Sequence, residues 1–201
     1  MRNFAKLAGV ACAALGLGVT GANAVPVEWT IASGGNGHFY DFIEFEGTWG
    51  DARADALALS HNGQAGYLIT LTSADEQAFY IGVFGQVDGW IGANDIDSEG
   101  VWLWADGPEA GQQFWSGGSG GSATGPFNYA SWGSGQPDDS GGEDAAQFGG
   151  GDWIDLSEDE LLFGYLIEYN AAVTGVPEPV TLSLLGSGLL GVAAFRRMRR
   201  A

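Results

Sequence analysis

Seven side chains that could supply oxygen ligands gather in one glycine-rich stretch, between residues 132 and 155. They are Gln136, Asp138, Asp139, Glu143, Asp144, Asp152 and Asp155, and no Lys or Arg lies among them. Carboxylates held close together repel one another, so such a loop is costly unless a cation or a proton lies between them. Calcium takes about six to eight oxygen ligands from carboxylates, amides and carbonyls. The stretch therefore indicates a calcium site, and an ordinary solvated acidic loop is the alternative.

The charged residues are distributed very unevenly along the 201-residue chain, which has 25 acidic and 7 basic residues. Arg53 is the only base between Lys6 and Arg196. Binding of nucleic acid requires a basic surface, and the middle of this chain cannot supply one. Divalent cations, neutral ligands and basic partners are compatible with its charge.

The length and composition predict one globular domain plus targeting segments. Apolar residues make up 45% of the chain, and 35 glycines indicate many turns and loops. The only cysteine, Cys12, lies near the N-terminus, so the predicted domain is free of disulfides. An exported domain without disulfides must be held together by its core or by a metal, which favours calcium.

Residues 1–24 have the pattern of a secretory signal peptide. Arg2 and Lys6 accompany an apolar run over residues 7–19, and the small-residue sequence Ala-Asn-Ala at 22–24 resembles a cleavage site before Val25. We therefore predict that the protein is exported through the inner membrane.

The C-terminal residues form a second targeting segment. An apolar run over residues 180–195 is followed directly by four arginines within RRMRR at 196–200. The run is short for the roughly 20 residues that a membrane-spanning helix needs, but the arginines fit a tail anchor with a cytoplasmic C-terminus.

A short motif precedes this run and consists of Val176, Pro177, Glu178 and Pro179. The order of this motif, the short transmembrane helix and the arginine cluster resembles the PEP-CTERM sorting signal. The resemblance implies recognition by an exosortase-type membrane enzyme and removal of the tail. It also implies delivery to the cell envelope or the outside, often together with exopolysaccharide.

Between the two targeting segments, residues 25–171 are predicted to form one α+β domain, with 172–201 as linker and sorting signal. Thr48 would cap a helix over residues 49–60, and a capping box from Ser73 to Glu76 would open a second helix ending near 83. Strands are expected over residues 29–31, 39–45, 90–92, 101–104 and 163–169, and around Phe148 and Trp153.

Aromatic and histidine residues are assigned by their surroundings. Trp49, Trp90, Trp102, Trp104 and Trp153 lie in helix or strand patterns and are expected in the core. Trp115 and Trp132, in the loop-rich region, are the candidates for stacking on a sugar ring. His38 and His61 lie beside turns, where a surface or capping role is expected rather than metal binding.

Six blocks of sequence, in order, resemble the C-type lectin-like domain over about residues 38–170. They are residues 49–56, residues 66–70 with 73–79, residues 90–95, residues 99–107, residues 132–138 with 143–144, and residues 153–155. The resemblance implies a fold with two helices, small antiparallel sheets and a long calcium-binding loop region.

The resemblance also implies two calcium sites. The principal site would take Gln136, Asp138, Glu143 and Asp155, which would also bind two vicinal sugar hydroxyls. Pro137 resembles the cis-proline that turns its neighbours toward the ion. Gln-Pro-Asp resembles the galactose-type arrangement, whereas Glu-Pro-Asn would indicate mannose. The auxiliary site would take Asp95, Glu99, Asp139 and Asp144.

Three features depart from the family pattern. Ile154 stands where the family has an Asn ligand, the usual disulfide cysteines are absent, and the spacing from Asp139 to Glu143 is short. These changes affect sugar specificity more than they affect the fold or the auxiliary calcium site.

The predicted function is calcium-dependent carbohydrate binding at the cell envelope or in the extracellular matrix, with exopolysaccharide as a candidate glycan. The alternative is a structural or adhesive surface protein that calcium only stabilises, and Ile154 is the main argument for it. An enzyme is not predicted. Glycosidase carboxylates need an apolar setting and a cleft, and the sequence shows neither a nucleophile–histidine pair nor zinc spacing.

Overall fold

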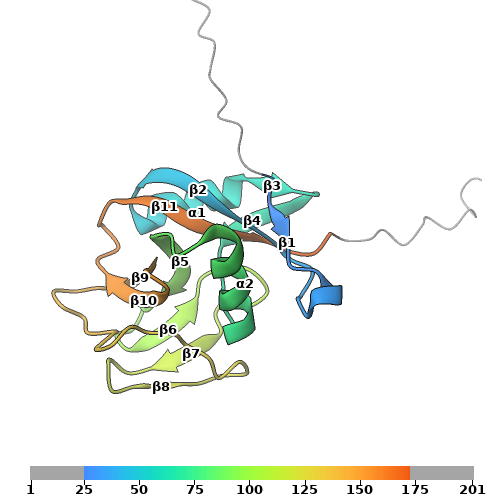
Figure 1. The fold of residues 1–201 in the computed structure, drawn as a ribbon. Coiled ribbons are helices and arrows are strands. Elements are labelled where there is room, and N and C mark those ends of the chain that lie inside the picture. Colours follow the sequence, from blue (N-terminus) through green and yellow to red (C-terminus); the bar gives the residue numbers. More distant parts are fainter. Residues whose placement is uncertain (1–24, 173–201) are drawn as a thin grey trace, which may run out of the picture.

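The computed structural model describes residues 25–172. Its two longest strands, β2 (Phe39–Gly47) and β11 (Leu162–Tyr169), pair antiparallel. The short strand β1 (Val27–Glu28) pairs with the start of β2, so both ends of the described chain lie on the same side of the molecule (Figure 1). The predicted signal peptide and the predicted sorting signal, with its motif at 176–179, lie outside the described residues. No helix among residues 25–172 is long and apolar enough to span a membrane.

The remaining strands extend from β11 in two directions. The sheet runs in the order β1-β2-β11-β5-β6-β7-β8, with β5 (Gly89–Asn94), β6 (Val101–Trp104), β7 (Gln113–Ser116) and β8 (Ser122–Ala123). The hairpin of β3 (Ser60–His61) and β4 (Gln64–Leu68) joins β11, and the hairpin of β9 (Ala145–Gly149) and β10 (Asp152–Leu156) joins β5. The pairing of β11 with β5 is parallel, whereas the other strand pairs of the described residues are antiparallel.

Both predicted helices are present and begin where their caps predict. Helix α1 (Trp49–Ala58) follows Thr48, whose hydroxyl accepts a hydrogen bond from the backbone N–H of Asp51 in a reciprocal capping box. Helix α2 (Ala74–Phe84) follows Ser73, which accepts from the N–H of Glu76. The Glu76 side chain does not return to Ser73 but enters the core instead.

The predicted strand over residues 29–31 is wrong. Residues Ile31–Ser33 form a short 3-10 helix, because the side chain of Thr30 accepts a hydrogen bond from the N–H of Ser33 and stops extension of the chain. Trp29 is buried beside this turn and stacks on Phe79 of α2.

All five tryptophans expected in the core are buried. Trp132, expected as a sugar platform, is half-buried and packs edge-to-face against Trp102 and Trp153. Trp115 is also half-buried and donates from its indole to the carbonyl of Gly117. The structure therefore makes Trp132 a member of the core and leaves its ring less available for stacking on a ligand.

Arg53 is the only Lys or Arg among the described residues, and its charge is already paired. Its Nε and Nη2 atoms donate to the two carboxylate oxygens of Asp106 at 2.6 and 2.9 Å. The guanidinium also lies 5.6 Å from the ring centroid of Trp49. This bidentate arrangement fixes α1 against the turn after β6.

Candidate functional site

The predicted ligand residues come from three segments that the sheet brings together. Asp95 and Glu99 lie in the turn between β5 and β6, and Asp155 lies in β10. Asp138 and Asp144 lie in the long irregular segment between β8 and β9. Because β9 pairs with both β5 and β10, the end of this segment is held beside the other two (Figure 1).

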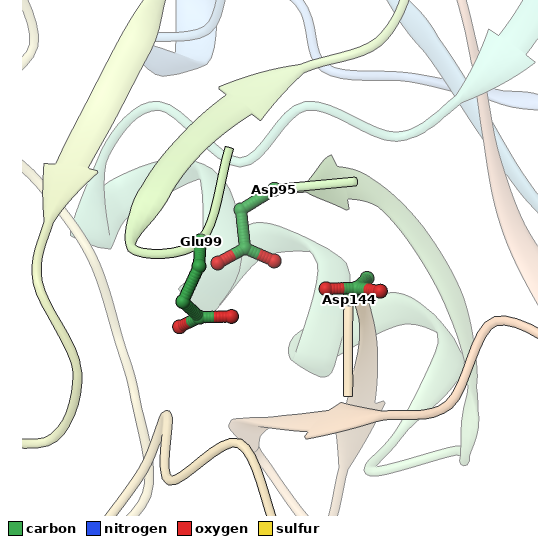
Figure 2. A group of neighbouring side chains, drawn as sticks. All are labelled: Asp95, Glu99 and Asp144. Carbon is green, nitrogen blue, oxygen red and sulfur yellow. The ribbon is translucent and has the colours of Figure 1, made fainter. Parts of the chain in front are cut away.

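Asp95, Glu99 and Asp144 form the first group of carboxylates, with one oxygen of each lying within 4.8 Å of the others. Figure 2 shows Asp95 between Glu99 and Asp144. The group is fixed by the backbone, since the N–H of Asp95 donates to the carbonyl of Asp144 at 3.1 Å. One oxygen of Asp95 accepts from the N–H of Gly100 at 2.8 Å.

Asp138, Glu143 and Asp155 form the second group, in which the ligand oxygens again lie within 4.8 Å of one another. The peptide bond between Gln136 and Pro137 is cis, as predicted, and lies directly before Asp138. The N–H of Ser140 lies within hydrogen-bond distance of carboxylate oxygens of both Asp138 and Glu143, at 3.2 and 3.1 Å.

Asp139, predicted for the auxiliary site, hydrogen-bonds to two residues of the second group, and its charge also acts on Glu99 and Asp144 of the first. Its N–H donates to Oδ2 of Asp155 at 2.8 Å, and its Oδ1 accepts from the N–H of Glu143 at 3.1 Å. Its backbone has a φ of 50°, a left-handed conformation that Asp tolerates better than most residues. These hydrogen bonds give Asp139 a role in shaping the loop.

The electrostatics of both groups favour uptake of a cation or a proton. Burial raises the pKa of Asp95 to about 7, and the charges of Glu99, Asp144 and Asp155 act in the same direction. Burial likewise raises the pKa of Asp155, with the charge of Asp138 adding to the effect. Burial is the larger cause in both cases, and like charges with no basic neighbour add to it.

Three buried oxygens of the two groups have no hydrogen-bond donor. They are Oδ1 of Asp95, Oδ1 of Asp155 and Oε1 of Gln136. A buried acceptor without a partner is unfavourable, and a cation would satisfy it. The chemistry of these residues therefore fits a calcium ion, to which carboxylate and amide oxygens are suited.

Ile154 lies within β10, where Trp153 and Asp155 are buried and Ile154 is half-buried. A Cβ atom added at Gly149 would lie 3.3 Å from Cδ1 of Ile154, which shows that this side chain extends along the neighbouring strand β9. Its hydrocarbon cannot act as a ligand.

The core contains a further polar cluster that the sequence did not predict. Glu76 and Glu168 are both 1% exposed, and the hydroxyl of Tyr40 donates to Glu76 at 2.6 Å. His38, expected at the surface, is mostly buried and contacts Glu168. The available signal was a glutamate within the otherwise apolar residues 165–169, because a buried strand rarely carries an unpaired charge.

Proteins of similar sequence include C-type lectins and halomucin. Rat C-type lectin domain family 4 member F is 33% identical over 107 residues, which cover 51% of this chain and 16% of that protein. Halomucin of Haloquadratum walsbyi is 36% identical over 140 residues, which cover 69% of this chain and 2% of halomucin. The chain thus spans a small part of the length of these relatives. No family model matches the sequence.

The cow C-type carbohydrate-recognition domain of CD23, solved in the presence of GlcNAc2Man3 oligosaccharide, has a similar structure. Its TM-score is 0.54 at 26% identity, covering 73% of this chain and 95% of that one. Residues 25–172 therefore have the C-type lectin-like fold, which belongs to the α+β class. The domain contains no cysteine, which agrees with the predicted disulfide-free fold.

Proposed function

We propose that this protein is an exported, calcium-dependent carbohydrate-binding protein of the cell envelope or extracellular matrix. The observation that carries the proposal is the set of unpaired buried oxygens on Asp95, Gln136 and Asp155, at two groups of carboxylates. The likeness to a carbohydrate-recognition domain supports the choice of a glycan as the partner.

Each group has a distinct role in this proposal. Asp95, Glu99 and Asp144 would hold an auxiliary calcium ion that ties the turn after β5 to the long loop, with Asp139 supporting it. Gln136, Asp138, Glu143 and Asp155 would hold the principal ion. When bound, that ion would coordinate two vicinal sugar hydroxyls, and the carboxylates around it would accept their hydrogen bonds.

Binding rather than catalysis is proposed because the acids of each group share one environment. A glycosidase requires one carboxyl kept protonated and one ionised across a substrate cleft. Here burial and mutual repulsion raise the pKa of Asp95, Glu143 and Asp155 alike. Turnover of oligosaccharides by the purified protein would contradict this part of the proposal.

Titration calorimetry with calcium, paired with thermal melts in calcium and in EGTA, tests the metal. A ligand that binds the native state must stabilise it, so an unchanged melting temperature and no binding heat would reject the calcium sites. A glycan array run with calcium and with EGTA tests the sugar. Asp138→Ala should abolish glycan retention, and Asp97→Asn, an exposed acid outside both groups, serves as the control.

The second candidate function is a calcium-stabilised structural or adhesive protein without sugar binding. Ile154 favours it, because the principal group has no side-chain oxygen at that position. Calcium binding with an empty glycan array would support this candidate.

The proposed export and processing by an exosortase-type enzyme rest on the terminal segments, and a mass measurement of the protein isolated from its source would test both cleavages.

A further inference from the structure

An apolar groove with an acidic rim lies on a part of the domain that shares no residue with the two carboxylate groups. Its volume is about 530 Å³, and it runs between β2, the start of β11 and the turn after α2. Phe42, Phe45, Val87 and Phe163 supply its apolar lining. Phe163 is 76% exposed, and the neighbouring Leu161 is 53% exposed. A large aromatic side chain left this exposed beside a groove is unusual for a surface that faces only water.

Glycine shapes the floor of this groove. A Cβ atom at Gly164 would lie 2.2 Å from Cζ of Phe42, so only a bare backbone lets the Phe42 ring lie against β11. A Cβ atom at Gly47 would similarly lie 2.3 Å from Cε1 of Phe45. The Phe42 and Phe45 rings therefore each lie against a glycine, and both side chains are only half-buried.

Strand β2, which supplies part of the groove lining, also has an edge that is open among the described residues. β11 pairs along one edge of β2, whereas β1 pairs with the other edge only at Phe39 and Tyr40. Beyond Tyr40 the outer edge of β2 has no strand partner within residues 25–172. An unpaired edge of this kind can accept an extended peptide through backbone hydrogen bonds.

All the charged residues on the rim of the groove are acidic. Glu44 and Glu46 are exposed on β2, and Asp88 is exposed on the opposite wall. Asp88 is fixed in place, because its Oδ1 accepts a hydrogen bond from the N–H of Gly150 at 3.1 Å. Arg53, the only Lys or Arg of the described residues, is bound to Asp106 and does not line the groove.

The negative charge of the rim determines which kind of partner the groove can bind. A second copy of the domain docked through the same face would place Glu44, Glu46 and Asp88 against their own equivalents, and an anionic lipid surface would be repelled. We propose that the groove binds a positively charged peptide segment of another protein, which inserts an aromatic or aliphatic side chain between Phe42 and Phe163. Its basic side chains would pair with the acidic rim.

Fluorescence anisotropy with labelled synthetic peptides tests the proposal on the full-length protein. The probe alternates lysine with phenylalanine, and two comparison peptides replace every phenylalanine by alanine or every lysine by glutamate. We expect the lysine–phenylalanine peptide to bind at least about tenfold more tightly than either comparison peptide. Binding should weaken at high salt, because the acidic rim is exposed. Equal binding of the alanine peptide would overturn the proposal, since only charge would then matter.

Two variants locate the site. Phe163→Ser and the double variant Glu44→Gln/Glu46→Gln should each weaken peptide binding at least about fivefold, with melting temperatures unchanged because these side chains are exposed. The control double variant Glu28→Gln/Asp75→Asn removes the same charge from exposed positions outside the groove lining and should bind as the wild type does. Loss of binding in the control, or retention in Phe163→Ser, would overturn the assignment.

Two further measurements separate the other occupants. If Phe163→Ser converts a dimer into a monomer in sedimentation velocity, the face is an interface between copies and the proposal is wrong. If a variant lacking residues 173–201 binds the peptide much more tightly than the full-length protein, the chain's own arginine-rich segment is the occupant. Unchanged sedimentation and unchanged affinity in these two experiments support a separate cationic partner.

Discussion

The Nδ1 atom of His38 and the Oε1 atom of Glu168 lie 2.5 Å apart, although 130 positions separate the two residues in the chain. The other oxygen of Glu168 accepts from both the N–H and the hydroxyl of Thr70 at 3.1 Å. Glu76 of α2 joins the same cluster through Tyr40. This polar cluster connects β2, β11 and α2 inside the core.

His38 makes stability dependent on pH. Burial lowers its pKa, but the hydrogen bond and the charge of Glu168 outweigh burial, so the pKa lies above 6.5. Since protonation is favoured in the folded state, this stabilisation is complete below about pH 6.5 and is lost as the pH rises through the folded-state pKa. We expect His38→Gln to remove this pH-dependent stabilisation, because the glutamine side chain does not take up a proton.

Urea unfolding at a series of pH values measures this effect. His61→Gln, at the only other histidine of the sequence, is the matched control that shows whether the effect is specific to His38. An unchanged slope in the His38 variant would show that other groups of the core control the response.

Removing the charge of Asp95 should stabilise the calcium-free domain, whereas replacing His38 should destabilise it. Its folded-state pKa of about 7 exceeds the ordinary value of 3.8, with burial as the largest cause. The calcium-free protein therefore loses stability as the pH rises from about 4 to about 7. At pH 7.5 in EGTA, Asp95→Asn should be more stable than the wild type by about 2–4 kcal/mol.

Calcium should reverse the order of stability of the wild type and the Asp95→Asn variant. The Asn variant lacks the carboxylate, so its increase in melting temperature on calcium addition should be smaller than that of the wild type. Asp97→Asn, at an exposed neighbouring acid, should behave as the wild type in both buffers. Destabilisation of the Asp95 variant in EGTA would instead show that its bond to Gly100 dominates.

Ile154→Asn should strengthen the principal site if this position faces the ion. An amide oxygen would replace a hydrocarbon that cannot act as a ligand, and we expect about threefold or greater tightening of calcium or sugar binding. Titration calorimetry with Ile154→Val as the control separates a new ligand from a change in packing. No gain with Asn would indicate that the side chain remains directed along β9.

Two glycines should respond oppositely to substitution by alanine. A Cβ atom at Gly92 would lie 2.7 Å from the carbonyl oxygen of Leu68, so Gly92→Ala should destabilise the domain by about 2 kcal/mol or more. Gly82 lies in α2 with open space around it, so Gly82→Ala should stabilise by about 0.5–1 kcal/mol through helix propensity. Thermal melts of the two variants provide the comparison.

Local sequence signals predicted both helices, but they did not predict the short polar strands. Thr48 and Ser73 mark both helix starts because a cap acts on its own first turn. The short strands β3 and β8 contain polar and small residues without alternation, so no periodicity identified them. Their pairing depends on partners that the fold brings near.

The candidate site was predictable only through the ordered sequence blocks. Local chemistry indicated a cation near Asp138 and Asp155, but nothing local connects Asp95 with Asp144, which lie on separate segments. The contact of His38 with Glu168 was missed for the same reason, since its two members are far apart in the chain.

The pairing of Arg53 with Asp106 has a consequence for the resistance of the domain to proteases. Trypsin-like proteases cut after lysine or arginine, and residues 25–172 contain only this one such position. It lies within α1 with the N–H edge of its guanidinium bound to Asp106 and the guanidinium over the ring of Trp49, so a protease must first unwind the helix to cleave there. The folded domain should thus pass intact through trypsin digestion, and Asp106→Ala should expose a single internal cut that gel electrophoresis resolves.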